Sequence, residues 1–156
     1  MRFHNPNQQA LAVFLQEVNY LFPVPLSDRR DLGELAEKIH RRGHCLLACD
    51  GEKVMGGISW YDNDTVTRQS YVNILAVLPQ YQGHGVAGAL LEKVISMQPP
   101  HIDSIRLRTQ TPIALHMYIK RGFVLENPDD DEQACVEHGC YLIKQLRSQT
   151  PSRGTV

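Results

Sequence analysis

The chain has 156 residues and a mass of 17.7 kDa, a length that fits one domain with a full hydrophobic core and leaves no room for a second. It carries 16 Lys and Arg against 17 Asp and Glu, so it lacks the basic excess of a nucleic-acid-binding protein. Its 42% of hydrophobic residues argue against global disorder, no apolar run approaches the ~20 residues of a membrane-spanning helix, and residues 1–6 lack the apolar core of a signal peptide. The chain is therefore predicted to be cytoplasmic, without a nucleic-acid or membrane partner.

Two helices are predicted in the N-terminal third of the chain. The first follows the start signal Asn5–Asn7, where apolar residues begin to recur at helical spacing, and Pro23 breaks it. The second begins at Ser27 or Asp28, either of which can cap it, and ends at Gly43.

A β-hairpin is predicted next. A strand over 44–49 leads to Asp50-Gly51, a strong hairpin-turn signal, and a second strand returns over 53–61. Alternation in the returning strand places three apolar side chains on one face: Val54, Ile58 and Trp60.

Strands and helices alternate in the second half. Residues 68–78 form the longest strand candidate, and its near-continuous apolar end predicts burial on both faces. The elements expected after Pro79 are a helix over 85–97, a strand over 104–110, a helix over 112–121, and strands over 123–126 and 140–146 around an acidic loop, 127–137. Hairpins beside helical crossovers predict an α/β fold with a mixed sheet.

The four cysteines are interpreted as small buried hydrophobes. Cys45, Cys49, Cys135 and Cys140 form no Cys-x-x-Cys pair, and a chain of this length needs no disulfide to fold. Cys140 with His138 as a nucleophile and its base, or as half of a zinc site, is the disfavoured alternative, so no metal is expected.

A glycine-rich segment before the third helix is the most informative part of the sequence. Gly83, Gly85 and Gly88 allow the backbone to approach an anion closely, with N–H groups and the helix dipole directed at it. A phosphate-bearing ligand is favoured over a tight structural turn. The same glycines, with Asp103, match a dinucleotide-binding fingerprint, but 79–82 separate them from the strand and Asp103 precedes the next strand, which contradicts that fingerprint.

The segment resembles motif A of the GNAT (Gcn5-related) N-acetyltransferase family. The motif reads Gln/Arg-x-x-Gly-x-Gly/Ala after a strand ending in Val-x-Pro, and here it is Gln82–Ala87 behind Val77-Leu78-Pro79. Motif B matches through Thr111–Ala114, Tyr118 and Gly122-Phe123. The resemblance covers roughly 44–146.

The resemblance implies a single GNAT-type domain over 1–147, followed by a polar, frayed tail over 148–156. Its sheet is expected to be mixed and mostly antiparallel, with central splayed parallel strands and about four flanking helices. Only Met1–Asn5 is available for the family's first strand, which is therefore expected to be missing or vestigial.

The resemblance also implies that acetyl-CoA enters between the strands over 68–78 and 104–110. Its pantetheine arm would pair with the backbone of Leu75, Ala76 and Val77. The diphosphate would lie on the N–H groups of Gln82, Gly83, His84, Gly85, Val86, Ala87 and Gly88. Thr111 stands where the family often has an asparagine that contacts the cofactor, so that contact is expected to be shorter or lost.

The activity implied is direct transfer of an acetyl group to the primary amine of a small molecule in a ternary complex. Tyr118 would be the general acid that protonates the departing thiolate. Asn73 would position a water. The general base is left open among Asn73, Tyr71, His116 and His138, because Arg106 stands where one subgroup of the family has a glutamate base.

The acceptor side would be lined by 22–26 and by 127–132. Four consecutive acids, 129–132, either recruit a cationic amine or form a solvated charge run. A protein or peptide N-acetyltransferase and a non-catalytic acyl-CoA-binding domain are the alternative functions, and a homodimer is left open.

Overall fold

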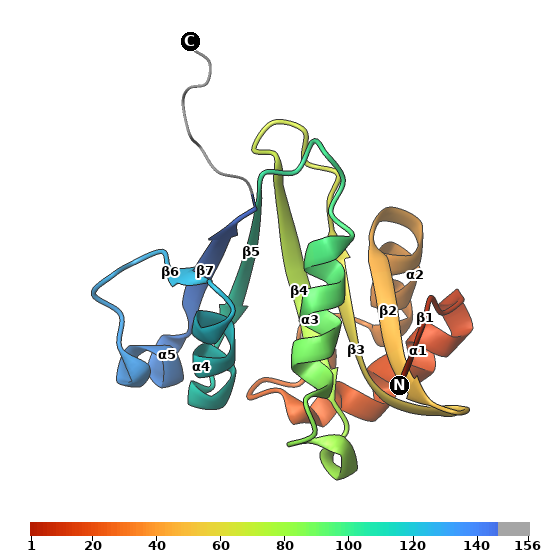
Figure 1. Cartoon of the computed structure of the whole chain (residues 1–156). Coiled ribbons are helices and arrows are strands. Elements are labelled where there is room, and N and C mark those ends of the chain that lie inside the picture. Colours follow the sequence, from red (N-terminus) through yellow and green to blue (C-terminus); the bar gives the residue numbers. More distant parts are fainter. Residues whose placement is uncertain (147–156) are drawn as a thin grey trace.

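A computed structural model describes residues 1–146 as a seven-stranded sheet with helices on both faces (Figure 1). The strands are β1 (Arg2–His4), β2 (His44–Asp50), β3 (Lys53–Tyr61), β4 (Gln69–Val77), β5 (Ser104–Thr109), β6 (Val124–Leu125) and β7 (Cys140–Gln145). The α-helices are α1 (Gln8–Val18), α2 (Leu32–Arg42), α3 (Val86–Ser96), α4 (Pro112–Lys120) and α5 (Glu132–His138). Short 3₁₀ turns are η1 (Asn19–Leu21), η2 (Leu26–Asp28) and η3 (Pro79–Tyr81). The tail expected over 148–156 lies outside the described residues.

The sheet has the order β1-β2-β3-β4-β5-β7-β6, and only β4 and β5 are parallel among the strands described. Every other neighbouring pair is antiparallel. The expected mixed, mostly antiparallel sheet with a central parallel pair is therefore confirmed.

Two apolar clusters hold the layers together, one on each face of the sheet. Helices α3, α4 and α5 pack on one face, and α1 and α2 cover the other (Figure 1). Since α1 and α2 pack mainly against β2, β3 and β4, the second face of β5 and β7 is left without a helix.

The first strand is present, although it is only three residues long. It pairs with β2 from Arg2 opposite Cys49 to His4 opposite Leu47. A short edge strand of this kind offers few unpaired backbone groups to another chain.

Two β-bulges change which side chains share a face. The register between β2 and β3 skips Met55, so Val54 packs in the cluster beneath α1 and α2, whereas Ile58 and Trp60 pack in the other. The prediction that these three share one face is wrong, because a bulge inserts one residue and reverses the alternation.

The second bulge lies in β4. Ile74 pairs with Ser59 and Val72 pairs with Trp60, so Asn73 is the extra residue. Buried and half-buried residues alternate along β4. Its apolar end packs against both clusters, with Ile74 and Ala76 buried in one and Leu75 and Val77 half-buried against the other, so the expected burial on both faces is confirmed in part.

Helix α2 begins later than expected. Its N-cap is Asp31, whose carboxylate accepts a hydrogen bond from the Glu34 amide at 3.0 Å, while Ser27 and Asp28 lie in η2. Ser27 is engaged with Asn19, which accepts from the Ser27 amide at 2.8 Å. The predicted cap at either residue is therefore wrong, since a side chain bonded elsewhere does not cap a helix.

The acidic loop expected over 127–137 contains a helix. The Asp131 carboxylate caps α5 by accepting from the Ala134 amide at 2.8 Å, and Cys135 anchors the helix in the apolar core. The sequence does not mark the start of this short helix, because its N-cap is one of four consecutive acidic residues.

Candidate functional site

Strands β4 and β5 separate halfway along their length. Their ladder runs from Gln69 opposite Ser104 to Val72 opposite Leu107 and ends there. Beyond that point β4 stays paired with β3 and β5 stays paired with β7. The bulge at Asn73 lies where the strands part, so we refer to this point as the fork.

Backbone groups of β4 line the opening below the fork. The Leu78 amide donates to the Met55 carbonyl at 2.8 Å, so alternation directs the N–H and C=O of Ala76 toward β3 and those of Leu75 and Val77 toward the opening. An extended ligand can therefore pair with Leu75 and Val77 as an added strand does. The Ala76 backbone faces the wrong way for the pairing expected of it.

The glycine loop leads from β4 into α3 through two left-handed residues. Gly83 and Gly85 both have φ +80°, and a Cβ on either would meet open space, so the backbone conformation is what requires glycine. Gly85 is the N-cap of α3 and supplies no side-chain cap. The first amides of α3 are thus left for an anion, as expected for Val86, Ala87 and Gly88.

The side chain of Gln82 connects the glycine loop to the end of β4. Its side-chain amide donates to the Val77 carbonyl at 3.0 Å, which ties the loop back onto the end of β4. The side chain therefore shapes the loop beside the opening, and its backbone remains the part that can face a ligand.

Gly88 makes room for an arginine from another element. A Cβ on Gly88 would lie 2.0 Å from Nη2 of Arg121, which follows α4. The guanidinium is held there by the Met117 carbonyl at 3.3 Å and by Glu92, whose Oε2 is 3.4 Å from Nε. A side chain at this position would displace the Arg121 guanidinium, a contact that the sequence did not reveal.

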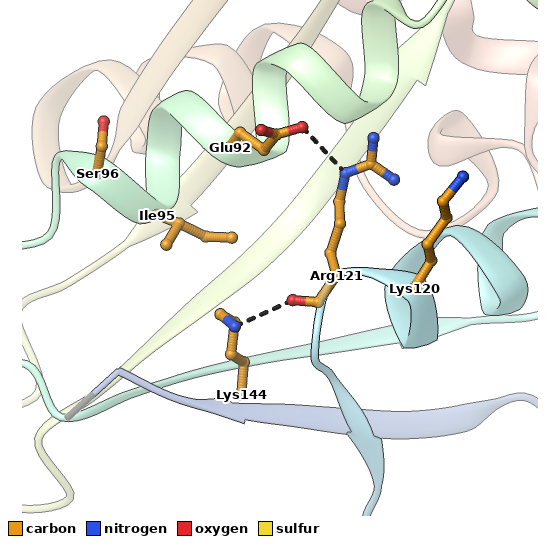
Figure 2. Close-up of a pocket in the computed structure, with 6 residues that line it drawn as sticks. All are labelled: Glu92, Ile95, Ser96, Lys120, Arg121 and Lys144. Atoms are coloured by element: carbon orange, nitrogen blue, oxygen red, sulfur yellow. Dashed lines mark hydrogen bonds and ion pairs between the residues drawn. The ribbon is translucent and has the colours of Figure 1, made fainter. Parts of the chain in front are cut away.

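A pocket of about 520 Å³ opens between α3 and the end of α4 (Figure 2). It is lined by Glu92, Ile95 and Ser96 of α3, by Lys120 and Arg121, and by Lys144 of β7. Figure 2 shows the Arg121 guanidinium directed at Glu92, and Lys144 donating to the Arg121 carbonyl at 3.0 Å. Three cations against one acid suit an anionic ligand. The signal in the sequence is the basic pair Lys120-Arg121, which stands directly before Gly122-Phe123 of motif B.

Tyr118 lies in the core between the sheet and α4. It is 5% exposed, and its ring packs against Phe123 with centroids 5.7 Å apart. Burial raises the pKa of this phenol, which keeps it protonated at neutral pH.

Of the residues considered for the base, two lie at the fork. Asn73 accepts a hydrogen bond from the Ser59 hydroxyl at 2.5 Å, and Tyr71 is two residues before it on β4. His116 is paired on the surface with Glu132 at 2.8 Å, and His138 ends α5 with its carbonyl bonded to Arg108. Both histidines lie on helices, outside the two strands that form the fork, and are the weaker candidates for the base.

Thr111 uses its side chain as the N-cap of α4. Its hydroxyl accepts from the Ala114 amide at 3.3 Å. That bond occupies the hydroxyl that replaces the family's asparagine, and the shorter or lost cofactor contact stays a prediction.

Within the described part of the chain, no group of three His, Cys, Asp or Glu side chains is arranged to hold a metal ion. No helix between residues 1 and 146 combines the length and the apolar character needed to cross a membrane.

Comparison with protein families gives a match to the acetyltransferase (GNAT) domain over residues 41–125, more than half of the chain. A curated relative is N-alpha-acetyltransferase 30 of Saccharomyces cerevisiae, 40% identical over 62 residues. That alignment covers 38% of this chain and 35% of the yeast protein, so the chain matches about a third of that relative's length.

Solved structures agree on the fold. A spermidine N-acetyltransferase from Vibrio cholerae superposes with a TM-score of 0.69 at 18% identity, covering 94% of this chain and 95% of that one. Arabidopsis thaliana NAA60, solved in complex with a bisubstrate analogue, has a TM-score of 0.72 at 15% identity, covering 92% and 97%. At these identities the likeness shows the fold alone.

Proposed function

Because the chain belongs to the GNAT acetyltransferase family, we propose that it transfers the acetyl group of acetyl-CoA directly to the primary amine of a small molecule in a ternary complex. One observation carries the proposal: the fork between β4 and β5 opens beside the uncapped first turn of α3. A thioester on an extended arm fits the first feature, and the diphosphate of the same molecule fits the second.

The placement of acetyl-CoA follows from the backbone. Its pantetheine arm pairs with the N–H and C=O groups of Leu75 and with the N–H of Val77, whose carbonyl already accepts from Gln82. Its diphosphate accepts from the amides of Val86, Ala87 and Gly88. Arg121 and Lys120 add positive charge in the neighbouring pocket, where phosphate groups of the nucleotide end are neutralised.

The chemical step needs an acid, an oxyanion donor and a neutral amine. The amine nitrogen attacks the thioester carbon, a C–N bond forms, and the carbonyl oxygen becomes an oxyanion that accepts from the amide of Leu75 or Val77. The C–S bond then breaks and the thiolate leaves. Tyr118 donates its phenolic proton to that sulfur, while the amine proton passes to water held at Asn73.

A peptide N-terminus is the second candidate acceptor. The 40% identity with a yeast N-alpha-acetyltransferase over 62 residues favours it. Arg106, which stands where one protein-acetylating subgroup has its glutamate base, speaks against it, since a guanidinium cannot take up a proton.

Two measurements test the proposal. Calorimetry with acetyl-CoA is expected to show one site per chain, and an assay of released CoA thiol is expected to show turnover with a small amine and slower turnover with peptides. Gly85→Ala, which forces a side chain into φ +80°, is expected to weaken binding, whereas Gly51→Ala at φ +61° in a remote hairpin is the matched control.

Three outcomes are informative. An absence of heat with acetyl-CoA contradicts the whole proposal, and binding without turnover on any amine supports a non-catalytic acyl-CoA-binding domain. Faster turnover with peptides supports the second candidate. The cytoplasmic location, the lack of nucleic-acid and membrane partners, and the homodimer stay predictions.

A further inference from the structure

We propose that the acceptor amine also carries an anionic group, a carboxylate or a phosphate, and that Arg108 binds this group beside the fork. This inference rests on the proposed function and names the class of acceptor that the same site takes.

Arg108 occupies the first position of β5 beyond the ladder with β4. The last ladder pair is Val72 with Leu107, and Arg108 pairs on its other side with Tyr141 of β7. Leu107 is buried beneath α3 and α4, so alternation places the Arg108 side chain on the opposite face, which α1 and α2 leave open at β5 and β7. The guanidinium therefore lies beside the opening, on the side from which we expect the amine to approach.

The Arg108 guanidinium is held in place but not neutralised. Nη2 donates to the His138 carbonyl at 2.8 Å and Nη1 donates to the Gln110 side-chain oxygen at 3.4 Å, and the group lies over Gly139, where a Cβ would come within 2.4 Å of it. No carboxylate pairs with it among residues 1–146. A guanidinium has more N–H donors than these contacts use, so a planar anion can still bind it through two bonds.

Its neighbour Arg106 is a different case. Glu126 takes up the Arg106 guanidinium through two bonds of 2.5 and 3.2 Å, and the Tyr141 ring lies 3.7 Å from its central carbon. The Arg106–Glu126 pair has no net charge. Arg108 therefore carries the positive charge at the fork that no carboxylate of the described residues compensates.

Guanidinium groups from two elements act on this face. Burial raises the pKa of the Tyr71 phenol, which lies beside Arg106 in the β4–β5 register, and the positive charges of Arg106, Arg108 and Arg29 oppose that rise. Arg29 comes from the connection between α1 and α2, so cations from two elements act at one point. Clustered guanidinium groups attract anions and repel polyamines.

The acidic run over 129–132, one of whose two expected roles is to recruit a cationic amine, is largely engaged in other contacts. Asp131 caps α5, and Glu132 pairs with His116. The charge of Asp130 acts on the buried Cys140 thiol, whose pKa burial raises to about 12, and Arg108 opposes that effect from the same neighbourhood. One nearby carboxylate does not reverse the excess of guanidinium groups.

Matched acceptors test the inference. Initial rates of CoA release are measured with L-phenylalanine against L-phenylalaninamide, with O-phosphoethanolamine against ethanolamine, and with spermidine. The anionic member of at least one pair is expected to have a kcat/KM about tenfold or more above its neutral partner, as for a charge-assisted bidentate contact. The first pair reports a carboxylate and the second a phosphate.

Variants assign the effect to Arg108. Arg108→Gln is expected to raise KM for the anionic acceptor until the preference disappears, with little change in kcat/KM for the neutral partner or in acetyl-CoA affinity. Arg108→Lys keeps the charge and is expected to retain part of the preference, whereas a purely structural role makes Lys and Gln equivalent. Arg41→Gln, an exposed arginine of α2 paired with Glu37, is the matched control and is expected to behave as wild type.

The failure of this inference is distinct from that of the proposed function. Turnover without charge preference, or a preference for spermidine, overturns the inference and leaves the acetyltransferase assignment standing. Equal losses on anionic and neutral acceptors in Arg108→Gln also overturn it. A lack of turnover with every amine overturns the proposed function, and the inference with it.

Discussion

Burial gives Tyr118 the protonation state that a general acid needs. Burial raises the pKa of its phenol, so the proton stays on the oxygen until a thiolate forms nearby. An acid of this kind donates only when a stronger base than water appears, as a departing thiolate does.

Replacing Tyr118 by phenylalanine removes the proton and keeps the ring against Phe123. We expect Tyr118→Phe to lower kcat by about a hundredfold and to leave the Kd of acetyl-CoA nearly unchanged. Because the pKa is raised, kcat of the wild type is expected not to fall as pH rises from about 7 to about 9.5. Tyr20→Phe, at a side chain 79% exposed, is the control, and a Tyr118→Phe variant with full activity removes this residue from the mechanism.

The Tyr61 hydroxyl has no catalytic role and does not stabilise the fold through a hydrogen bond. Its oxygen is buried and has no hydrogen-bond partner in the described residues, while its ring packs against Gly43 and beneath Lys38. Tyr61→Phe keeps the ring and is expected to leave the free energy of unfolding unchanged or to raise it by up to about 1 kcal/mol. Urea unfolding measures this, and a loss above about 1 kcal/mol means that the hydroxyl is bonded after all.

At the scale of elements, α3 and α4 meet through the contact of Gly88 with Arg121. Gly88→Ala is expected to displace the guanidinium and to weaken acetyl-CoA binding, while the free energy of unfolding changes by no more than about 1 kcal/mol, because the flexible end of Arg121 can move and alanine favours a helix. Unfolding and calorimetry on the single variants and on Gly88→Ala with Arg121→Ala give a double-mutant cycle. If the clash is the cause, the glycine substitution costs less when Arg121 is absent, and strict additivity would falsify that explanation.

The sequence predicts elements well where a local signal marks both ends. Asn7 and Pro23 delimit the first helical segment, and Pro112 starts α4, because proline and capping side chains act within one turn. The bulges at Met55 and Asn73 carry no such signal, since the extra residue is defined only by its partner strand. Helix α5 was missed for a related reason: its seven residues depend on Cys135 reaching a core formed by distant strands.

The same distinction between local and long-range signals applies to the candidate site. The sequence predicts the roles of Gly83 and Gly85, because glycines just before a helix are a local signal of a left-handed backbone. The roles of Arg121 and Arg108 were not predicted, because each guanidinium lies over a glycine about thirty residues away in the chain, and only the folded sheet brings the two together. The orientation of Ala76 likewise needs the register between β3 and β4.

For the whole molecule, buried acids make stability depend on pH at the alkaline end. Burial raises the pKa of the Cys45 thiol from 9.0 to about 12, and it raises that of Cys140 to about 12 as well. The folded state therefore keeps protons that the unfolded chain releases above pH 9. Stability from these groups is fully present below that pH and is lost as pH rises toward 12.

Each such thiol is expected to lower the free energy of unfolding by about 1.4 kcal/mol per pH unit above pH 9. Urea unfolding in the presence of a reductant, between about pH 8 and about pH 10.5, measures the slope. Cys45→Ala is expected to be less stable at every pH, because it leaves a cavity, but its slope should be smaller by one thiol. Equal slopes in the variant and the wild type would mean that Cys45 ionises as freely in the folded chain as in the unfolded one, and that solvent reaches the interface of β2 with α1 and α2.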